Sequence, residues 1–311
     1  MEGSASQAGF YYQNNVAALK IIDCLFFNSD INYIELENYS KGHHIDDIIV
    51  YSKDRIDYYQ VKWSNDGETV YSLYNLLNAE EGKKSLFKQL SEGYKSVLKN
   101  KVDFSITLYT TKREGSERRP SKGINHSLPE IRRKIFEPLK KSSLGYESIN
   151  DYDTYKDSLE IIRNECDLSK DSFNDFIKKL EFLFSQESTE QIQNEIRFKF
   201  DKLGIEDNLL EKLLDGVVNW SITGEKITKN SVLKVLGISS RFEDKLSHYF
   251  KVVDDKHYVP NKSLLSKLYI ALNELCGGYI FIEGLPGIGK STALTKFKKS
   301  NPDVTLAYYC F

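Results

Sequence analysis

The stretch IDDIIVYSKDRIDYYQVKW, residues 45–63, constrains the fold of this chain more than any other segment. Two runs rich in β-branched and aromatic residues flank the short polar segment SKDR, a pattern that predicts an antiparallel β-hairpin. If the loop is SKDR or only its two central residues, the numbers of paired residues sum to 107, and Asp47 lies directly opposite Gln60. Asp47, Gln60 and Lys62 then project from one face of the hairpin, and Asp46 projects from the other. A loop of three or five residues would exchange the two aspartates, so both stay candidates.

The segments around the hairpin predict a compact α/β core. Helical spacing of apolar residues predicts a helix over 10–27, and Gln13 lies on its apolar side, where a polar group needs a hydrogen-bonding role. Residues 31–37 alternate as a strand, and residues 83–98 form an amphipathic helix. Residues 102–112 alternate again and predict a further strand. The expected order is helix, three strands, helix and strand.

The rest of the chain is predicted to contain an exposed loop and helices instead of further alternating helices and strands. The basic, Gly/Ser/Pro-containing segment from Arg113 to Gly123 is typical of an exposed loop. Residues 128–216 have helical patterns throughout, and residues 222–262 indicate short helices with turns. The expected domains are an α/β core at 1–125, a helical extension at 126–216, a helical linker at 217–275 and a new domain that begins at 276–311.

Composition limits the classes of protein and of function. With a formal net charge of −2 at pH 7, the chain is not a grossly basic nucleic-acid binder, although a local basic patch is sufficient for binding. The four cysteines are scattered without a CxxC pair, which predicts neither a disulfide framework nor a zinc site and fits a reducing compartment. No apolar run approaches the roughly 20 residues that span a bilayer. We expect a soluble, cytoplasmic protein with no membrane partner.

The shared face of the hairpin carries the residue types that cleave phosphodiesters. Asp47 and Gln60 together offer oxygen ligands for Mg²⁺, or for Mn²⁺ in its place, and Mg²⁺ needs only one or two carboxylates. Lysine is rarely buried, and Lys62 suits a role in positioning the attacking water and offsetting negative charge. Glu37 on the preceding strand is a candidate second ligand, and Glu35 is its rival on the same face.

Five motifs together resemble the PD-(D/E)XK nuclease superfamily, in the variant where Gln replaces the second acid. More narrowly, they resemble the dsDNA endonuclease domain of CBASS and antiviral STAND effectors. The resemblance implies a restriction-endonuclease-like core, a mixed sheet flanked by helices, with Asp47 and Gln60 at the metal and Lys62 as the catalytic lysine. It also implies that Gln13 and Glu37 are supporting active-site residues. The motifs are GFYYQ at 9–13, IELE at 34–37, IDDIIV at 45–50, YYQVKW at 58–63 and ITLYTTK at 106–112.

The segment GLPGIGKS at 284–291 matches the phosphate-binding P-loop pattern, with the expected strand YIFIE at 279–283 before it and a helical run after it. Its backbone N–H groups and the helix N-terminus are suited to binding a phosphate. Lys290 would contact the β- and γ-phosphates, and Ser291 would ligate a bound Mg²⁺. The motif resembles that of NACHT/STAND ATPases. The predicted nucleotide-binding residues are Gly284, Gly287, Gly289, Lys290, Ser291 and Thr292.

Because few residues follow the P-loop, we expect the N-terminal fragment of a P-loop NTPase domain, with ATP bound by a longer polypeptide. We expect no ATP hydrolysis by this chain. The amphipathic helix at 265–275 would pack on the rest of that domain, which predicts uncovered apolar surface and either self-association or poor order near the C-terminus.

The leading hypothesis is a Mg²⁺-dependent endonuclease effector of antiphage defence that cuts double-stranded DNA with little sequence specificity and is regulated by a P-loop ATPase module and by homo-oligomerisation. One alternative is a non-catalytic, nucleotide-gated STAND signalling or scaffold protein, and another is an ATP-dependent restriction endonuclease. A positive rim would bind the DNA backbone. Its candidate members are Lys112, Arg113, Arg118, Arg119, Lys122, Arg132, Arg133 and Lys134.

Overall fold

A computed structural model describes residues 2–36, 47–64, 70–79, 82–100, 102–120, 123–238, 259–274, 280–285 and 287–300. The chain divides into two units, Met1–Leu236 and Gly237–Phe311. The division therefore falls inside the segment 217–275, for which the sequence predicts a helical linker. Among the described residues, no helix is both long enough and apolar enough to cross a membrane.

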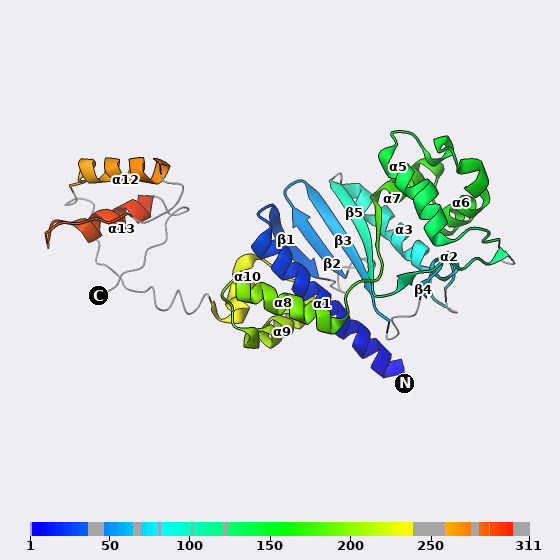
Figure 1. The fold of residues 1–311 in the computed structure, drawn as a ribbon, viewed down its shortest axis with the longest axis horizontal. Helices are drawn as coiled ribbons and strands as arrows, with labels where there is room; N and C mark the ends of the chain where they lie inside the picture. The colour runs from blue at the N-terminus through cyan, green and yellow to red at the C-terminus, as the bar shows by residue number, and fades with distance from the viewer. Residues whose placement is uncertain are drawn as a thin grey trace. The chain divides into compact units, whose positions relative to one another are not determined.

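The first unit is a mixed α/β structure built on a five-stranded sheet (Figure 1). The first three strands pair antiparallel, and the remaining pairs are parallel. A separate two-stranded parallel sheet contains β4 (Val70–Tyr71) and β6 (Arg113–Glu114). The order across the main sheet is β1 (Ile31–Leu36), β2 (Ile48–Ser52), β3 (Arg55–Lys62), β5 (Asp103–Thr110) and β7 (Leu180–Leu183).

Helices cover both faces of the main sheet (Figure 1). On one face, α1 (Glu2–Phe27) contacts the sheet, and α8 (Thr189–Lys202), α9 (Leu210–Thr223) and α10 (Lys229–Leu236) pack around it. On the other face, the sheet forms one continuous apolar core with a second group of helices. These are α2 (Leu73–Leu77), α3 (Leu86–Val97), α4 (Leu128–Ile131), the π-helical turn η4 (Arg132–Phe136), α5 (Glu137–Lys141), α6 (Tyr152–Cys166) and α7 (Lys170–Lys179).

The predicted hairpin and its register are confirmed. The pairs run from Ile48 with Tyr59 to Tyr51 with Ile56, so that paired numbers sum to 107. The Ser52 hydroxyl donates to the Arg55 carbonyl at 2.8 Å and closes the turn. The helices predicted over 10–27 and 83–98 and the strand predicted over 31–37 are also present, as α1, α3 and β1.

The strand predicted over 102–112 is confirmed as β5, whose residues 104–110 are all buried because β5 lies inside the sheet and helices cover both of its faces. One expectation about the first unit was wrong. Residues 128–216 are not helical throughout, since β7 interrupts them. Leu180 and Phe182 of β7 point into the core while the β7 backbone pairs with β5, and this pairing extends the sheet.

The second unit contains α12 (Lys262–Glu274) and α13 (Lys290–Ser300). The helical run predicted after the glycine-rich segment is confirmed as α13. The strand predicted at 279–283 is not formed over 280–283. A strand needs a hydrogen-bonded neighbour, and the described part of this unit contains no other strand to supply one.

The start of α4 predicts a stability that depends on pH. The Glu130 carboxylate accepts hydrogen bonds from the Ser127 hydroxyl and N–H at 2.7 and 2.8 Å, and it also pairs with Arg118. These contacts lower the pKa of Glu130 from 4.5 to about 2, with the Ser127 side chain as the largest cause. Because the folded pKa is depressed, the contribution is complete above pH 4.5 and is lost as pH falls toward 2.

We therefore expect Glu130→Gln to lower the melting temperature at pH 7, with a difference from the wild type that shrinks between pH 4.5 and 2. Thermal unfolding of both proteins across this pH range measures the difference. Glu137→Gln on the next helix is the control, and a Glu130→Gln difference that is constant with pH would contradict the assignment.

Candidate functional site

Asp47 and Gln60 meet at the start of β2. Asp47 Oδ2 accepts hydrogen bonds from Gln60 Nε2 at 2.7 Å and from the Val61 N–H at 2.5 Å. The Asp47 N–H donates to the Tyr59 carbonyl at 3.0 Å, which continues the pairing of β2 with β3. Asp47 is 8% exposed and Gln60 is 5% exposed. The carboxylate is therefore held in a fixed position against β3.

Lys62 lies two residues beyond Gln60 on the same strand and so on the same face. Ile49 and Tyr58 share this face and belong to the apolar core, whereas Lys62 at the strand end is partly exposed. The neighbouring residue on β5 is Thr110. Within the described ranges, the Lys62 ammonium forms no ion pair with a carboxylate. The structure thus brings an acid, an amide and a lysine together on one face, as the sequence predicted.

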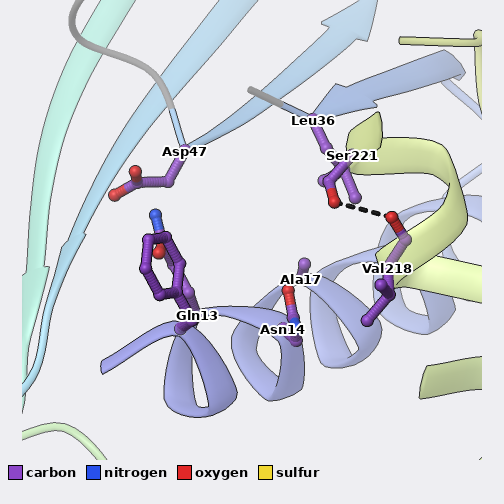
Figure 2. Close-up of a pocket in the computed structure, with 8 residues that line it drawn as sticks. Gln13, Asn14, Ala17, Leu36, Asp47, Val218 and Ser221 are labelled. Carbon is purple, nitrogen blue, oxygen red and sulfur yellow. Dashed lines mark hydrogen bonds between the residues drawn. The ribbon is translucent and has the colours of Figure 1, made fainter. Parts of the chain in front are cut away.

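A pocket of about 230 Å³ lies beside Asp47 (Figure 2). Figure 2 shows the Gln13 side chain extending from α1 toward Asp47. The walls contributed by α9 were not anticipated, because no motif in the sequence marks that helix as part of a site. The lining residues are Phe10, Gln13, Asn14 and Ala17 of α1, Leu36 of β1, Asp47, and Val218 and Ser221 of α9.

The structure describes only one of the two glutamates that the sequence offers as a second metal ligand. Glu37 lies outside the described residues, as does Asp46, so the proposed second ligand stays a prediction. Glu35 lies opposite Ile49, and its carboxylate accepts a hydrogen bond from the Tyr51 hydroxyl at 2.9 Å. Burial and the Glu35 charge both raise the pKa of Tyr51. Glu35 therefore has a structural partner, and its pair with Ile49 lies two residue positions along β2 from Asp47.

A divalent cation would find oxygen donors at this site. The Asp47 carboxylate and the Gln60 amide are of the hard-oxygen type that Mg²⁺ and Mn²⁺ accept, and Mg²⁺ keeps several waters. Gln60 directs Nε2 at Asp47, so its amide must turn over to offer Oε1 instead, a change that keeps its shape. Among the residues that the structure describes, no three His, Cys, Asp or Glu side chains gather in one place. Asp47 and Gln60 fit the cation as a pair completed by water.

Four of the eight residues of the predicted basic rim pair with carboxylates. Arg118 pairs with Glu130, and three further members have carboxylate partners. Lys112 differs, because its ammonium lies 4.4 Å from the centre of the Tyr71 ring. Lys122 lies outside the described residues. The three further pairs are Arg119 with Glu117 at 2.8 Å, Arg132 with Glu114 at 2.8 Å and Lys134 with Asp151 at 3.2 Å.

The glycine-rich segment of the second unit forms a tight turn before α13. Gly287 and Gly289 have φ of 82° and 87°, a region that strains any side chain. Lys290 folds back on this turn, donating from Nζ to the carbonyls of Gly284 at 2.6 Å and Leu285 at 3.0 Å. Ser291 and Thr292 follow in the first turn of α13. The predicted nucleotide-binding residues thus lie around one turn and one helix start.

The Asp47 contacts predict separable effects on stability. Asp47→Ala leaves the buried Val61 N–H without its acceptor, which should cost about 1–3 kcal/mol of unfolding free energy. Asp47→Asn keeps an oxygen acceptor and should cost less. Urea unfolding of the two variants against wild type measures this, and equal stability of Asp47→Ala and wild type would contradict the contact.

Comparisons with known proteins give limited similarity. No family model matches the chain, and no curated protein matches it. Among solved structures, it is similar to the Acinetobacter baumannii Cap4 SAVED/CARF-domain containing receptor, with 13% sequence identity and a TM-score of 0.41. The similarity covers 76% of this chain and 48% of that one, so the chain spans about half the length of the receptor.

Proposed function

We propose that the first unit is a metal-dependent endonuclease that hydrolyses phosphodiester bonds of double-stranded DNA. The observation that carries the proposal is the buried contact between Asp47 and Gln60 on adjacent strands, with Lys62 two residues further along the same face. Polar side chains on a strand usually face solvent, but Asp47 is only 8% exposed and accepts a hydrogen bond from Gln60, so solvation does not explain its position.

Each residue has a distinct role in this proposal. Asp47 and Gln60 hold the cation, and Gln13 contributes a further polar group from α1. The bound Mg²⁺ would polarise the phosphate and lower the pKa of its water. Lys62 donates hydrogen bonds to the attacking water or to a phosphate oxygen and offsets the charge that develops there. Glu37 follows Leu36 directly in the chain, and Leu36 lines the pocket beside Asp47.

The substrate class follows from charge and shape. Phosphate contacts supply affinity without sequence information, and no helix with base-reading side chains is suggested by the sequence. We therefore propose cleavage with little sequence specificity. The similarity of the five motifs to antiviral effector endonucleases supports a role in antiphage defence, with homo-oligomerisation as part of its control.

The second unit is proposed to bind ATP through its phosphate loop as part of a regulatory ATPase module. The carbonyls that Lys290 contacts are weak partners for an ammonium, and nucleotide phosphates would be stronger ones. A non-catalytic, nucleotide-gated scaffold is the alternative function. Like the nuclease proposal, this alternative has a second unit that binds ATP. Unlike that proposal, it gives Asp47, Gln60 and Lys62 no catalytic role.

Plasmid cleavage tests the nuclease directly. Lys62→Ala should reduce Mg²⁺-dependent cleavage by about 10²–10³-fold, since the loss of one preorganised donor typically costs that much in rate. EDTA should abolish cleavage by the wild type. Lys53→Ala is the matched control, because Lys53 lies in the turn of the same hairpin and pairs with Asp30. Cleavage that survives Lys62→Ala at full rate would contradict the proposal and favour the scaffold.

ATP binding tests the second unit. Fluorescent ATP should bind the wild type and fail to bind Lys290→Ala, because Lys290 is the cation at the loop. Lys296→Ala, on the same helix, is the control. No phosphate release is expected from either protein. Equal ATP binding by Lys290→Ala and wild type would overturn the assignment, and turnover lost with Lys290 would overturn the expected lack of hydrolysis.

A further inference from the structure

We propose that Lys112 is a backbone-phosphate contact of the DNA duplex, next to the phosphate that is cleaved. The inference rests on the proposed nuclease function and names one residue of the rim as the member that binds. It separates Lys112 from the four basic candidates that pair with carboxylates, which the sequence could not rank.

Lys112 lies at the edge of the sheet where Lys62 ends its strand. β3 and β5 run parallel, and Lys62 of β3 is the neighbour of Thr110, the last residue of β5. Carboxyl ends of parallel strands meet at one edge, so Lys112 follows Thr110 at the edge that carries Lys62. A duplex backbone that reaches Lys62 therefore passes close to Lys112.

The position of Lys112 is fixed in advance of binding. Its N–H donates to Thr110 Oγ1 at 3.2 Å, and its carbonyl accepts from the Ser185 N–H at 2.9 Å. The Gln186 N–H donates to the Thr110 carbonyl at 3.0 Å, which holds the same segment from the other side. The ammonium lies over the Tyr71 ring at 4.4 Å. Little conformational entropy remains to be lost when a phosphate binds here.

Lys112 differs in its charge compensation from the four rim residues that form ion pairs. Arg118, Arg119, Arg132 and Lys134 each have a carboxylate partner, whereas Lys112 has no carboxylate within the ranges that the structure describes. The side chain is half-buried, and this burial lowers the pKa of Lys112. A partly desolvated ammonium over a ring gains a charge-assisted hydrogen bond when it binds a phosphate oxygen. A cation paired with a carboxylate already has such a bond.

Lys179, the last residue of α7, provides a matched control beside β5. Its ammonium also lies over a ring, 4.6 Å from Phe104, but it pairs with Asp103 at 3.2 Å at the other end of β5. Changing each lysine to methionine keeps the aliphatic stem against the ring and removes only the charge. The two variants therefore differ in whether a carboxylate partner was present and in which end of the sheet they occupy.

The test is the salt dependence of binding to a short fluorescent duplex in EDTA, where no metal supports cleavage. Each phosphate contact contributes about 0.9 to the slope of log K against log salt, so Lys112→Met should lower that slope by about one and weaken binding at low salt. Lys179→Met should leave both values at those of wild type. Unfolding curves of both variants report whether each protein is folded.

The outcomes distinguish this inference from the nuclease proposal. An unchanged slope in folded Lys112→Met overturns the inference, whether or not the wild type cleaves DNA. A reduced slope supports the phosphate contact even if Lys62→Ala leaves cleavage unaltered, in which case the nuclease assignment fails alone. If Lys112→Met does not fold, Lys112→Gln removes the same charge with a polar side chain, and an unchanged slope in that folded variant overturns the inference.

Discussion

The buried contact of Asp47 with β3 is the constraint on which the candidate site depends. A carboxylate that is 8% exposed is stable in this position because Gln60 and the Val61 N–H donate to it. Both donors are available only when Asp47 lies opposite Gln60, since a slip of one residue would turn Gln60 to the opposite face. The register of the hairpin therefore determines both a structural hydrogen bond and the grouping of an acid, an amide and a lysine.

The same face changes character along its length. Tyr58 is 4% exposed within the apolar core, Gln60 is 5% exposed, and Lys62 is partly open to solvent at the strand end. Charges at such a boundary interact more strongly than in water, because one side of the site is apolar protein. Solvent access on the other side allows a large polyanion to approach. The helices that cover the sheet thus place apolar protein of low dielectric constant on one side of the site. At the strand ends the site is open to solvent.

Local patterns predicted the hairpin, its register, α1, α3 and the meeting of Asp47 with Gln60, because each depends on alternation or spacing within a short segment. β7 could not be predicted in this way. Leu180 and Phe184 continue the apolar spacing of α7 as a helix would, and pairing with the distant β5 decides for a strand instead. The wall that α9 gives the pocket beside Asp47 depends likewise on contacts far apart in the chain. The predicted strand YIFIE shows the reverse case, in which a local preference finds no partner strand among the described residues.

Charge balance explains why a basic segment is a poor guide to a DNA contact in this chain. The 43 basic side chains are matched by 45 acidic ones, so a basic segment readily finds carboxylates, and the pairs Arg132 with Glu114 and Lys134 with Asp151 join segments that sequence inspection cannot match. A paired cation must give up its carboxylate before it neutralises a phosphate, so its net contribution to affinity is small. The cations that matter are those whose only partner is a ring or solvent. In the proposed nuclease, Lys62 and Lys112 share the edge of the sheet where β3 and β5 end, so the charges that bind the backbone also bring it to the end of the strand that carries Gln60.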